Sequence, residues 1–187
     1  MLISSLIIEV FVLLHTSSGN QGENLALNKQ ARQSSTFTDY KSYPAYSAVD
    51  GSFDSADFSH TEETGIRWWT VDLGKRYSIG QIKLYNRWDC CQERLANITT
   101  LTSILDNLTD PSLSSPDWIA RAYRGPAYAA VGIIDFKPAI QAQHVAVYSS
   151  SDSKPLALLE VEVYGPNNLA LNKTVSQSST PGSNSAE

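Results

Sequence analysis

The 187-residue chain has little sulfur: it contains two cysteines and one methionine. The cysteines, Cys90 and Cys91, are adjacent. Their number excludes a four-thiolate zinc site, and their spacing excludes a CxxC redox motif. A disulfide between them would close almost no loop, and adjacent Cα atoms lie ~3.8 Å apart, below the usual disulfide span of roughly 4.4–6.8 Å. Such a bond is better explained as a rigid, weakly polar surface; two reduced cysteines or an intermolecular pair are the alternatives.

The chain also lacks an excess of positive charge. Its 14 Lys and Arg against 19 Asp and Glu give a formal net charge of −5. Removal of residues 1–19 takes away one charged residue, Glu9, and −5 + 1 leaves −4. A mildly acidic chain without a basic tract binds nucleic acids and anionic membranes poorly, so neither is expected as a partner.

Signatures of catalysis are missing as well. The sequence contains no G-x-S-x-G and no HExxH motif, and outside residues 1–19 it has only two histidines, His60 and His144. A glycosidase needs two carboxylates across a cleft, and candidates such as Asp57 and Glu62 are supported only by their abundance. The chain is therefore not expected to be an enzyme.

The N-terminus predicts export. Residues 1–19 contain an apolar run, 2–14, broken by Glu9 and followed by a small polar stretch, the layout of a secretory signal peptide. The run is too short for a comfortable transmembrane helix and no second one follows, so we expect a secreted protein without membrane insertion. Three glycosylation sequons, which agree with export, begin at Asn97, Asn107 and Asn172.

A repeat defines the domain organisation. NLALNK at 24–29, followed by QSST at 33–36, returns at 168–173 and 177–180, an offset of 168 − 24 = 144 residues. That offset is a reasonable domain length. We expect one complete domain over 24–166, followed at 167–187 by the start of a second, truncated repeat that is too short to bury a core of its own.

Inside the domain the hydrophobic period is two. Short segments place apolar residues at alternate positions between turn-rich stretches, and no long amphipathic helix is evident. Strands with one buried face, separated by long loops, predict an antiparallel β-sandwich. The alternating residues are Trp69, Val71 and Leu73; Ile82 and Leu84; Val145 and Val147; and Leu159, Val161 and Val163.

A donor-rich group of residues follows one predicted strand. The strand from Ile79 to Asn86 ends at Arg87, which is followed by Asp89 and Arg94, while His60 is expected in the loop before the strand at Trp68. Loops at one end of a sandwich cluster in space, so these side chains can converge. Guanidinium groups offer several fixed donors, which suits the hydroxyls of a neutral sugar. An ordinary surface salt-bridge patch is the alternative.

The spacing of these residues resembles the signature of the F-type lectins, or fucolectins. In that signature His is followed, after 26 residues, by Arg-x-Asp, four residues and a basic residue, and the vicinal cysteines fall inside the four-residue gap. The resemblance covers essentially all of 24–165. It includes the NLALNK and QSST opening, Ala48-Val49-Asp50-Gly51, the strand from Trp68 to Leu73, and the closing segment from Leu159 to Gly165.

The resemblance implies an eight-stranded jelly-roll sandwich of discoidin type that binds terminal α-L-fucose on glycans without catalysis, and a role in innate immunity. By position, His60, Arg87 and Arg94 would donate to sugar oxygens, and Asp89 would orient Arg87. Monosaccharide sites are weak, so tandem domains or oligomers would supply avidity.

An apolar side of the site is also implied, because fucose carries a methyl group in place of a hydroxymethyl group. The ring closed by Cys90 and Cys91 would pack against that edge of the sugar, and Trp88 would stack on a neighbouring sugar or cover the sheet. Candidates for the methyl pocket, each of which could equally be ordinary loop packing, are Tyr43, Tyr46, Phe53 and Phe58.

The resemblance further implies a structural calcium ion near the Asp50 loop and the last strand. The matching positions are Ser47, Asp50, Ser52, Asp57 and Glu160, several acting through backbone carbonyls. Oxygen ligands suit a hard cation. Solvated loop and strand carboxylates are the alternative explanation for Asp50 and Glu160.

The chain departs from many relatives in one respect. They carry a second disulfide at the positions that are Phe58 and Leu159 here, and a Phe–Leu contact could replace it. A rival function is a discoidin-like adhesion module that binds a protein or lipid surface. Such a module would need exposed apolar loop residues and no convergence of His60, Arg87 and Arg94.

Overall fold

The computed structural model describes residues 22–106, 108, 110–122, 130–149, 154–167 and 176. Residues 21–166 form one compact unit, and everything below concerns that unit alone. The predicted signal peptide, most of the second repeat, and the sequons at Asn107 and Asn172 lie outside the described residues. These expectations stay predictions.

The unit is nearly all β-structure, as expected. In the part of the chain that is described, no α-helix occurs, and none is therefore long and apolar enough to cross a membrane. The elements, in chain order, are β1 (Gln30–Gln33), η1 (Ala45–Ala48), β2 (Ser59–His60), β3 (Arg67–Tyr85), η2 (Gln92–Leu95), β4 (Ile98–Ser103), β5 (Ile119–Ala122), β6 (Val131–Ser149), β7 (Ala157–Leu158) and β8 (Glu160–Tyr164), where η denotes a short 3-10 helix.

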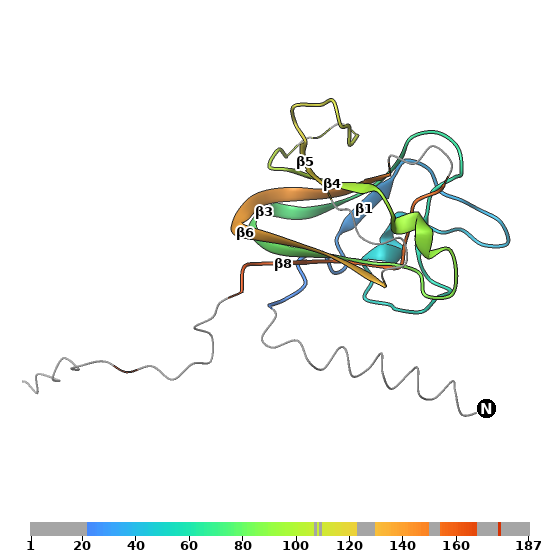
Figure 1. The fold of residues 1–187 in the computed structure, drawn as a ribbon, viewed down its shortest axis with the longest axis horizontal. Helices are drawn as coiled ribbons and strands as arrows, with labels where there is room; N and C mark the ends of the chain where they lie inside the picture. The colour runs from blue at the N-terminus through green and yellow to red at the C-terminus, as the bar shows by residue number, and fades with distance from the viewer. Residues whose placement is uncertain are drawn as a thin grey trace, which may run out of the picture. The chain divides into compact units, whose positions relative to one another are not determined.

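Two long strands contribute to both layers of the sandwich. The first part of β3 pairs with the last part of β6, and β1, β4 and β5 extend this layer in the order β1-β3-β6-β4-β5. The last part of β3 pairs with both the first part of β6 and β8. Figure 1 shows the curvature of β6. The sequence predicted separate strands at Trp68 and Ile79; they are one strand, irregular between Asp72 and Tyr77, where Gly74 adopts a φ of 85°.

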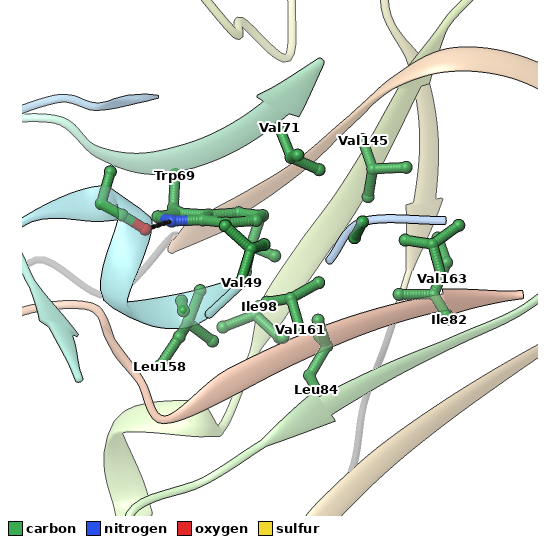
Figure 2. Packing of buried hydrophobic residues seen from close by; sticks show 14 of the residues in the cluster. Val49, Trp69, Val71, Ile82, Leu84, Ile98, Val145, Leu158, Val161 and Val163 are labelled. Atoms are coloured by element: carbon green, nitrogen blue, oxygen red, sulfur yellow. Dashed lines mark hydrogen bonds between the residues drawn. The ribbon is translucent and has the colours of Figure 1, made fainter. Parts of the chain in front are cut away.

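The core lies between these layers. Trp69, Val71 and Val145 face it from one side, and Leu84 and Val161 from the other, which confirms the predicted alternation (Figure 2). Trp69 is fully buried, and its Nε1–H donates to the carbonyl of Ala45 over 2.9 Å. A buried indole N–H without such a partner would be costly, so this bond fixes η1 against the core.

The repeated NLALNK motif holds the start of the unit against its last strand. The side-chain oxygen of Asn24 accepts from the backbone N–H groups of Ala26 (3.1 Å) and Val163 (3.0 Å), and the N–H of Leu25 donates to the Val163 carbonyl. Asn28, at a positive φ of 57°, donates to Val49. The motif therefore has a structural role, which explains its place at the start of a domain.

Candidate functional site

His60 lies in the short strand β2, not in the loop that the sequence predicted. Its backbone pairs with Ala157 of β7. Its N–H donates to the carbonyl of Tyr43 over 3.2 Å, and its own carbonyl accepts from the N–H of Phe37 over 2.9 Å. The pairing of a two-residue strand leaves no alternating pattern to read in the sequence, and this is why it was missed.

Arg87 and Asp89 follow the end of β3, as expected. Nε and Nη2 of Arg87 donate to the two carboxylate oxygens of Asp89 over 3.0 and 2.6 Å. This fork holds the guanidinium in one orientation and lowers the pKa of Asp89. The guanidinium carbon of Arg87 also lies 3.9 Å from the ring centroid of Phe58, so the cation is stacked on an aromatic face.

The adjacent cysteines form a disulfide that turns the chain into η2. Cys91 adopts a left-handed φ of 61°, and its carbonyl accepts from the N–H of Arg94, which η2 carries. The side chain of buried Asn86 closes the loop by donating to the Gln92 carbonyl over 2.7 Å. The Cys90–Cys91 disulfide and the hydrogen bond from Asn86 to Gln92 therefore position Arg94 together.

Arg94 and His60 meet directly, although 34 residues separate them. Nη1 of Arg94 lies 2.7 Å from Nε2 of His60, and Nδ1 of His60 lies 2.6 Å from the carbonyl of Thr61. Because guanidinium only donates and a carbonyl only accepts, Nδ1 carries the proton and Nε2 accepts from Arg94. The family resemblance implied that His60, Arg87 and Arg94 all donate to the sugar, which stays a prediction; in this structure His60 accepts from Arg94 and orients it.

The surroundings keep His60 neutral. Burial, followed by the positive charge of Arg94, lowers its pKa from 6.5 to about 4. His60 is only 5% exposed, which agrees with the loss of hydration that burial implies. Burial, followed by the nearby charge of Arg87, also lowers the pKa of Arg94. Two guanidiniums and a neutral imidazole therefore share one partly buried site.

Aromatic rings form the apolar side of this site. The ring of Phe37 lies 4.8 Å from that of His60, and the rings of Tyr43 and Phe58 lie 4.7 Å apart. Phe53 packs against the same cluster, referred to below as the aromatic wall (Phe37, Tyr43, Phe53, Phe58, Tyr85, Ala157 and Leu159). The sequence did not single out Phe37, and Tyr46, a candidate for the methyl pocket, lies outside the aromatic wall and is 64% exposed.

Phe58 and Leu159 are both buried in the aromatic wall. The family resemblance led us to expect a disulfide, in many relatives, at these two positions. Apolar packing of the two side chains in one cluster supports the idea that hydrophobic contact replaces the covalent link.

The QSS part of the repeated motif, Gln33 to Ser35, hydrogen-bonds to the backbone around His60, a role that the repeat alone did not indicate. Nε2 of Gln33 donates to the carbonyls of Tyr43 (3.0 Å) and His60 (3.2 Å). The hydroxyl of Ser34 accepts from the N–H of Trp68, and the hydroxyl of Ser35 accepts from the N–H of Glu62. The exact return of QSST after 144 residues was the available signal, but it said nothing of the partners.

The residues expected to hold calcium are brought together only in part. Glu160 is fully buried; its Oε1 accepts from Gly51 N–H over 3.3 Å, and its Oε2 has no hydrogen-bond partner in the described ranges. Burial, followed by the charge of Asp50, raises the pKa of Glu160 to about 8. Burial also raises the pKa of Asp50, and Asp57 adds to this.

The carboxylates of Asp50, Asp57 and Glu160 fit a cation only if other oxygen ligands complete the site. Mutual repulsion and an unpartnered buried oxygen are what a bound cation would relieve. However, no group of three His, Cys, Asp or Glu side chains within the described residues could hold a metal alone. Backbone or hydroxyl oxygens, such as those of the buried Ser47 and of Ser52, would have to complete the set.

The sequon at Asn97 is the one that can be placed. Asn97 is exposed, at a positive φ of 54°, immediately before β4. An exposed position suits a glycan acceptor, and glycosylation there stays a prediction.

Comparison with known proteins places the chain in a family. The pattern of the family described as "NedA-like, galactose-binding domain" matches residues 47–147. The lectin domain of lectinolysin, solved with Lewis B antigen, is 32% identical with a TM-score of 0.65, over 78% of this chain and 98% of that one. The f-lectin (fucolectin) from Morone saxatilis serum is 32% identical with a TM-score of 0.64, over 76% of this chain and 48% of that one. The chain belongs to the F-type lectin family.

The F-type lectin family also contains the curated relatives of this chain. Fucolectin-4 of Anguilla japonica is 33% identical over 108 residues, which cover 54% of this chain and 59% of the relative. The chain spans between 52% and 59% of the length of the seven curated fucolectins that it matches. The family membership and the all-β discoidin-like fold are thus confirmed.

Proposed function

We propose that this F-type lectin binds terminal α-L-fucose on glycans and does not catalyse a reaction. The observation that carries the proposal is the 2.7 Å contact between Arg94 and His60, which brings the residues of the signature into one site. The relatives support it: the lectin domain of lectinolysin was solved with Lewis B antigen, and a Streptococcus pneumoniae fucose-binding module is 29% identical with a TM-score of 0.63.

The chemistry of the site suits this sugar. Asp89 uses Nε and Nη2 of Arg87, so Nη1 can donate to a sugar hydroxyl, and Arg94 can donate with its remaining N–H groups. His60 would either keep Arg94 in place or exchange that contact for a sugar hydroxyl. The disulfide of Cys90–Cys91 and the aromatic wall would face the methyl group of fucose.

The biological setting belongs to the same proposal. The predicted signal peptide at 1–19 supports a secreted protein, and the names of the relatives support glycan recognition. A role in innate immunity is part of the proposal and rests on the family resemblance alone. Because one monosaccharide site is weak, we propose that tandem domains or oligomers supply avidity. A fucosylated glycan is the expected partner.

We also propose a structural calcium ion at Ser47, Asp50, Ser52, Asp57 and Glu160. The orphaned Oε2 of Glu160 supports it, because a buried carboxylate without a partner is otherwise costly. The ion would neutralise the group and hold the loop after η1 against β8, in which Glu160 lies.

The sugar site is tested by calorimetric titration of the chain with L-fucose, with D-galactose as the comparison. Arg87→Ala removes a charged donor, so we expect affinity for L-fucose to fall at least about tenfold, since hydrogen bonds to charged groups contribute about 1.5–3 kcal/mol. The matched control is Arg76→Ala, an exposed arginine outside the site, which should bind as the unchanged chain does.

Two results would contradict the proposal. Unchanged binding by folded Arg87→Ala would move the sugar away from the signature residues. Failure of the unchanged, folded chain to bind either sugar would instead favour the adhesion module, which the exposed Trp88 (52%) beside the site could serve.

Calcium is tested by thermal unfolding with and without a chelator. A ligand at about 100 times its Kd stabilises the native state by ~2.7 kcal/mol, which corresponds to roughly 5–10 °C for a chain of this size. We expect Glu160→Gln to lose this calcium-dependent shift, whereas Glu162→Gln, two positions along β8, should keep it. An unchanged melting temperature after chelation of the unchanged chain would remove the metal site.

A further inference from the structure

We propose that the outer face of the large sheet carries a second saccharide-binding site, for a neutral sugar, distinct from the site at His60. The site is a hollow of about 230 Å³ between this face and the segment that follows β4. Its polar lining residues are Gln30, Arg32, Thr70, Asp72, Asp106 and His144.

Strand register explains why these side chains share one face. Trp69, Val71 and Val145 point into the core, so their neighbours in the same strands point outward. The antiparallel pairs place residues of three adjacent strands side by side. One row is Gln30, Asp72 and His144, and the next row is Arg32 and Thr70.

His144 shows that this face is built for a polar partner. It is only 9% exposed, and among the residues that the structure describes its Nε2 has no hydrogen-bond partner. The nearest carboxylate oxygen recorded for it, Oδ1 of Asp72, is 3.8 Å away, beyond hydrogen-bond distance. A buried polar atom without a partner is costly, and a ligand hydroxyl between His144 and Asp72 would satisfy it.

The balance of charge selects the class of ligand. Asp72 and Asp106 outweigh Arg32, which within the described part of the chain forms one ion pair, a 3.5 Å contact with Asp110 between side chains that are 50% and 66% exposed. An anionic ligand would be repelled. A metal ion is also disfavoured, since no group of three His, Cys, Asp or Glu in the described ranges could hold one.

A neutral polyol fits what remains. Each sugar hydroxyl both donates and accepts, and the hollow offers the guanidinium of Arg32 as a donor beside the carboxylates of Asp72 and Asp106 as acceptors. Leu108 supplies apolar contact for a sugar ring, and the buried ring of Trp118, 6.4 Å from that of His144, packs behind the imidazole.

The hollow continues past Arg32, which leaves room for a second sugar unit. Arg32 also lines an adjoining, more open hollow of about 500 Å³. That hollow contains Tyr46, which is 64% exposed, whereas Trp68 is only 7% exposed and lies under the guanidinium of Arg32 at 5.8 Å. The exposed ring of Tyr46 is a stacking surface for a sugar, so the site has room for a disaccharide that runs across β1.

The test is nuclear magnetic resonance of the isotope-labelled chain carrying Arg87→Ala, so that a response at the first site is suppressed. Lactose, cellobiose, chitobiose and maltose would each be added to about 50 mM, since weak saccharide sites have Kd values on the order of millimolar. At least one should shift the imidazole signals of His144 and the amide signals of Thr70. Asp72→Asn and Arg32→Ala should each weaken that binding roughly tenfold, as loss of a charged hydrogen bond implies.

Lys75→Ala, which removes an exposed cation that lies outside both hollows and over the ring of Tyr77, is the control and should leave the response unchanged. Because Arg32 is largely exposed, its replacement should not disturb folding even if Asp72→Asn does. The proposal is overturned if none of the four disaccharides shifts His144 in the folded chain, or if the shift persists undiminished in Arg32→Ala. Neither result depends on whether fucose binds at His60, because the reporting signals belong to the other face.

Discussion

Acidification should destabilise this fold through His60. Its Nδ1 donates to the Thr61 carbonyl and its Nε2 accepts from Arg94, so an added proton would have to sit on Nε2, facing a guanidinium in a buried site. These surroundings lower the pKa of His60 to about 4, against 6.5 for an unperturbed histidine. The prediction concerns the free energy of unfolding, which this difference makes dependent on pH.

The sign follows from which state binds the proton. Between pH 6.5 and 4 the unfolded chain protonates this histidine and the folded chain does not, so stability is fully present above pH 6.5 and is lost as the pH falls. With these two values, the loss between pH 7.5 and pH 5 is about 2 kcal/mol, and it approaches ~3 kcal/mol below pH 4.

The assay is urea unfolding at pH 7.5, 6 and 5, at one fixed calcium concentration, for the unchanged chain and for His60→Gln. The glutamine oxygen can still accept from Arg94, but the side chain does not titrate. Because other groups titrate equally in both proteins, the difference between them isolates His60. A change of ~2 kcal/mol corresponds to roughly 1 M in the urea midpoint. Parallel pH dependence of the two proteins would refute the assignment of a neutral, buried His60.

Two further perturbations test how the site is held. Gln33→Met removes the amide that donates to the carbonyls of Tyr43 and His60, and the loss of one or two hydrogen bonds costs roughly 1–3 kcal/mol, so we expect fucose affinity to fall about tenfold with the fold retained. The control is Gln81→Met, which removes an exposed amide on β3 and should not change affinity. Equal affinities of the two variants would show that the Gln33 amide does not support the sugar site. Mild reduction of the Cys90–Cys91 disulfide should lower affinity while the circular dichroism spectrum persists, because the bond closes almost no loop; global unfolding would show that it stabilises the fold instead.

The fold class could be predicted because its signal is local. Alternation at Trp69, Val71 and Leu73 reports one buried face of a strand, whatever that strand packs against. The extent of the strand could not be predicted in the same way. Gly74 and the irregular register after Asp72 look like a turn in sequence, whereas β6 pairs with β3 on both sides of them and makes one bent strand of the two.

The sequence predicted only some members of the aromatic wall, because loop residues carry no periodic pattern. Phe58 and Tyr43 lie close in sequence to His60 and to the Asp50 loop, so they were reasonable candidates. Phe37 and Tyr46 could not be told apart by position, since each lies in a turn-rich stretch without a period. The backbone bond from Phe37 to His60 places the first at the site, and η1 turns the second to solvent.

The sequence by itself determined the fold class, an antiparallel sandwich, and the chemical groups available to this protein. These groups are one imidazole, two guanidiniums and a carboxylate at the spacing of the signature, and two adjacent cysteines whose disulfide closes almost no loop. Tertiary structure decided what those groups do to one another. The proton on His60 is placed by Thr61 and Arg94, and the second polar face exists because β1, β3 and β6 align residues from distant parts of the chain. Distances and burial set hydrogen-bond roles and pKa values, and neither is encoded in spacing along the chain.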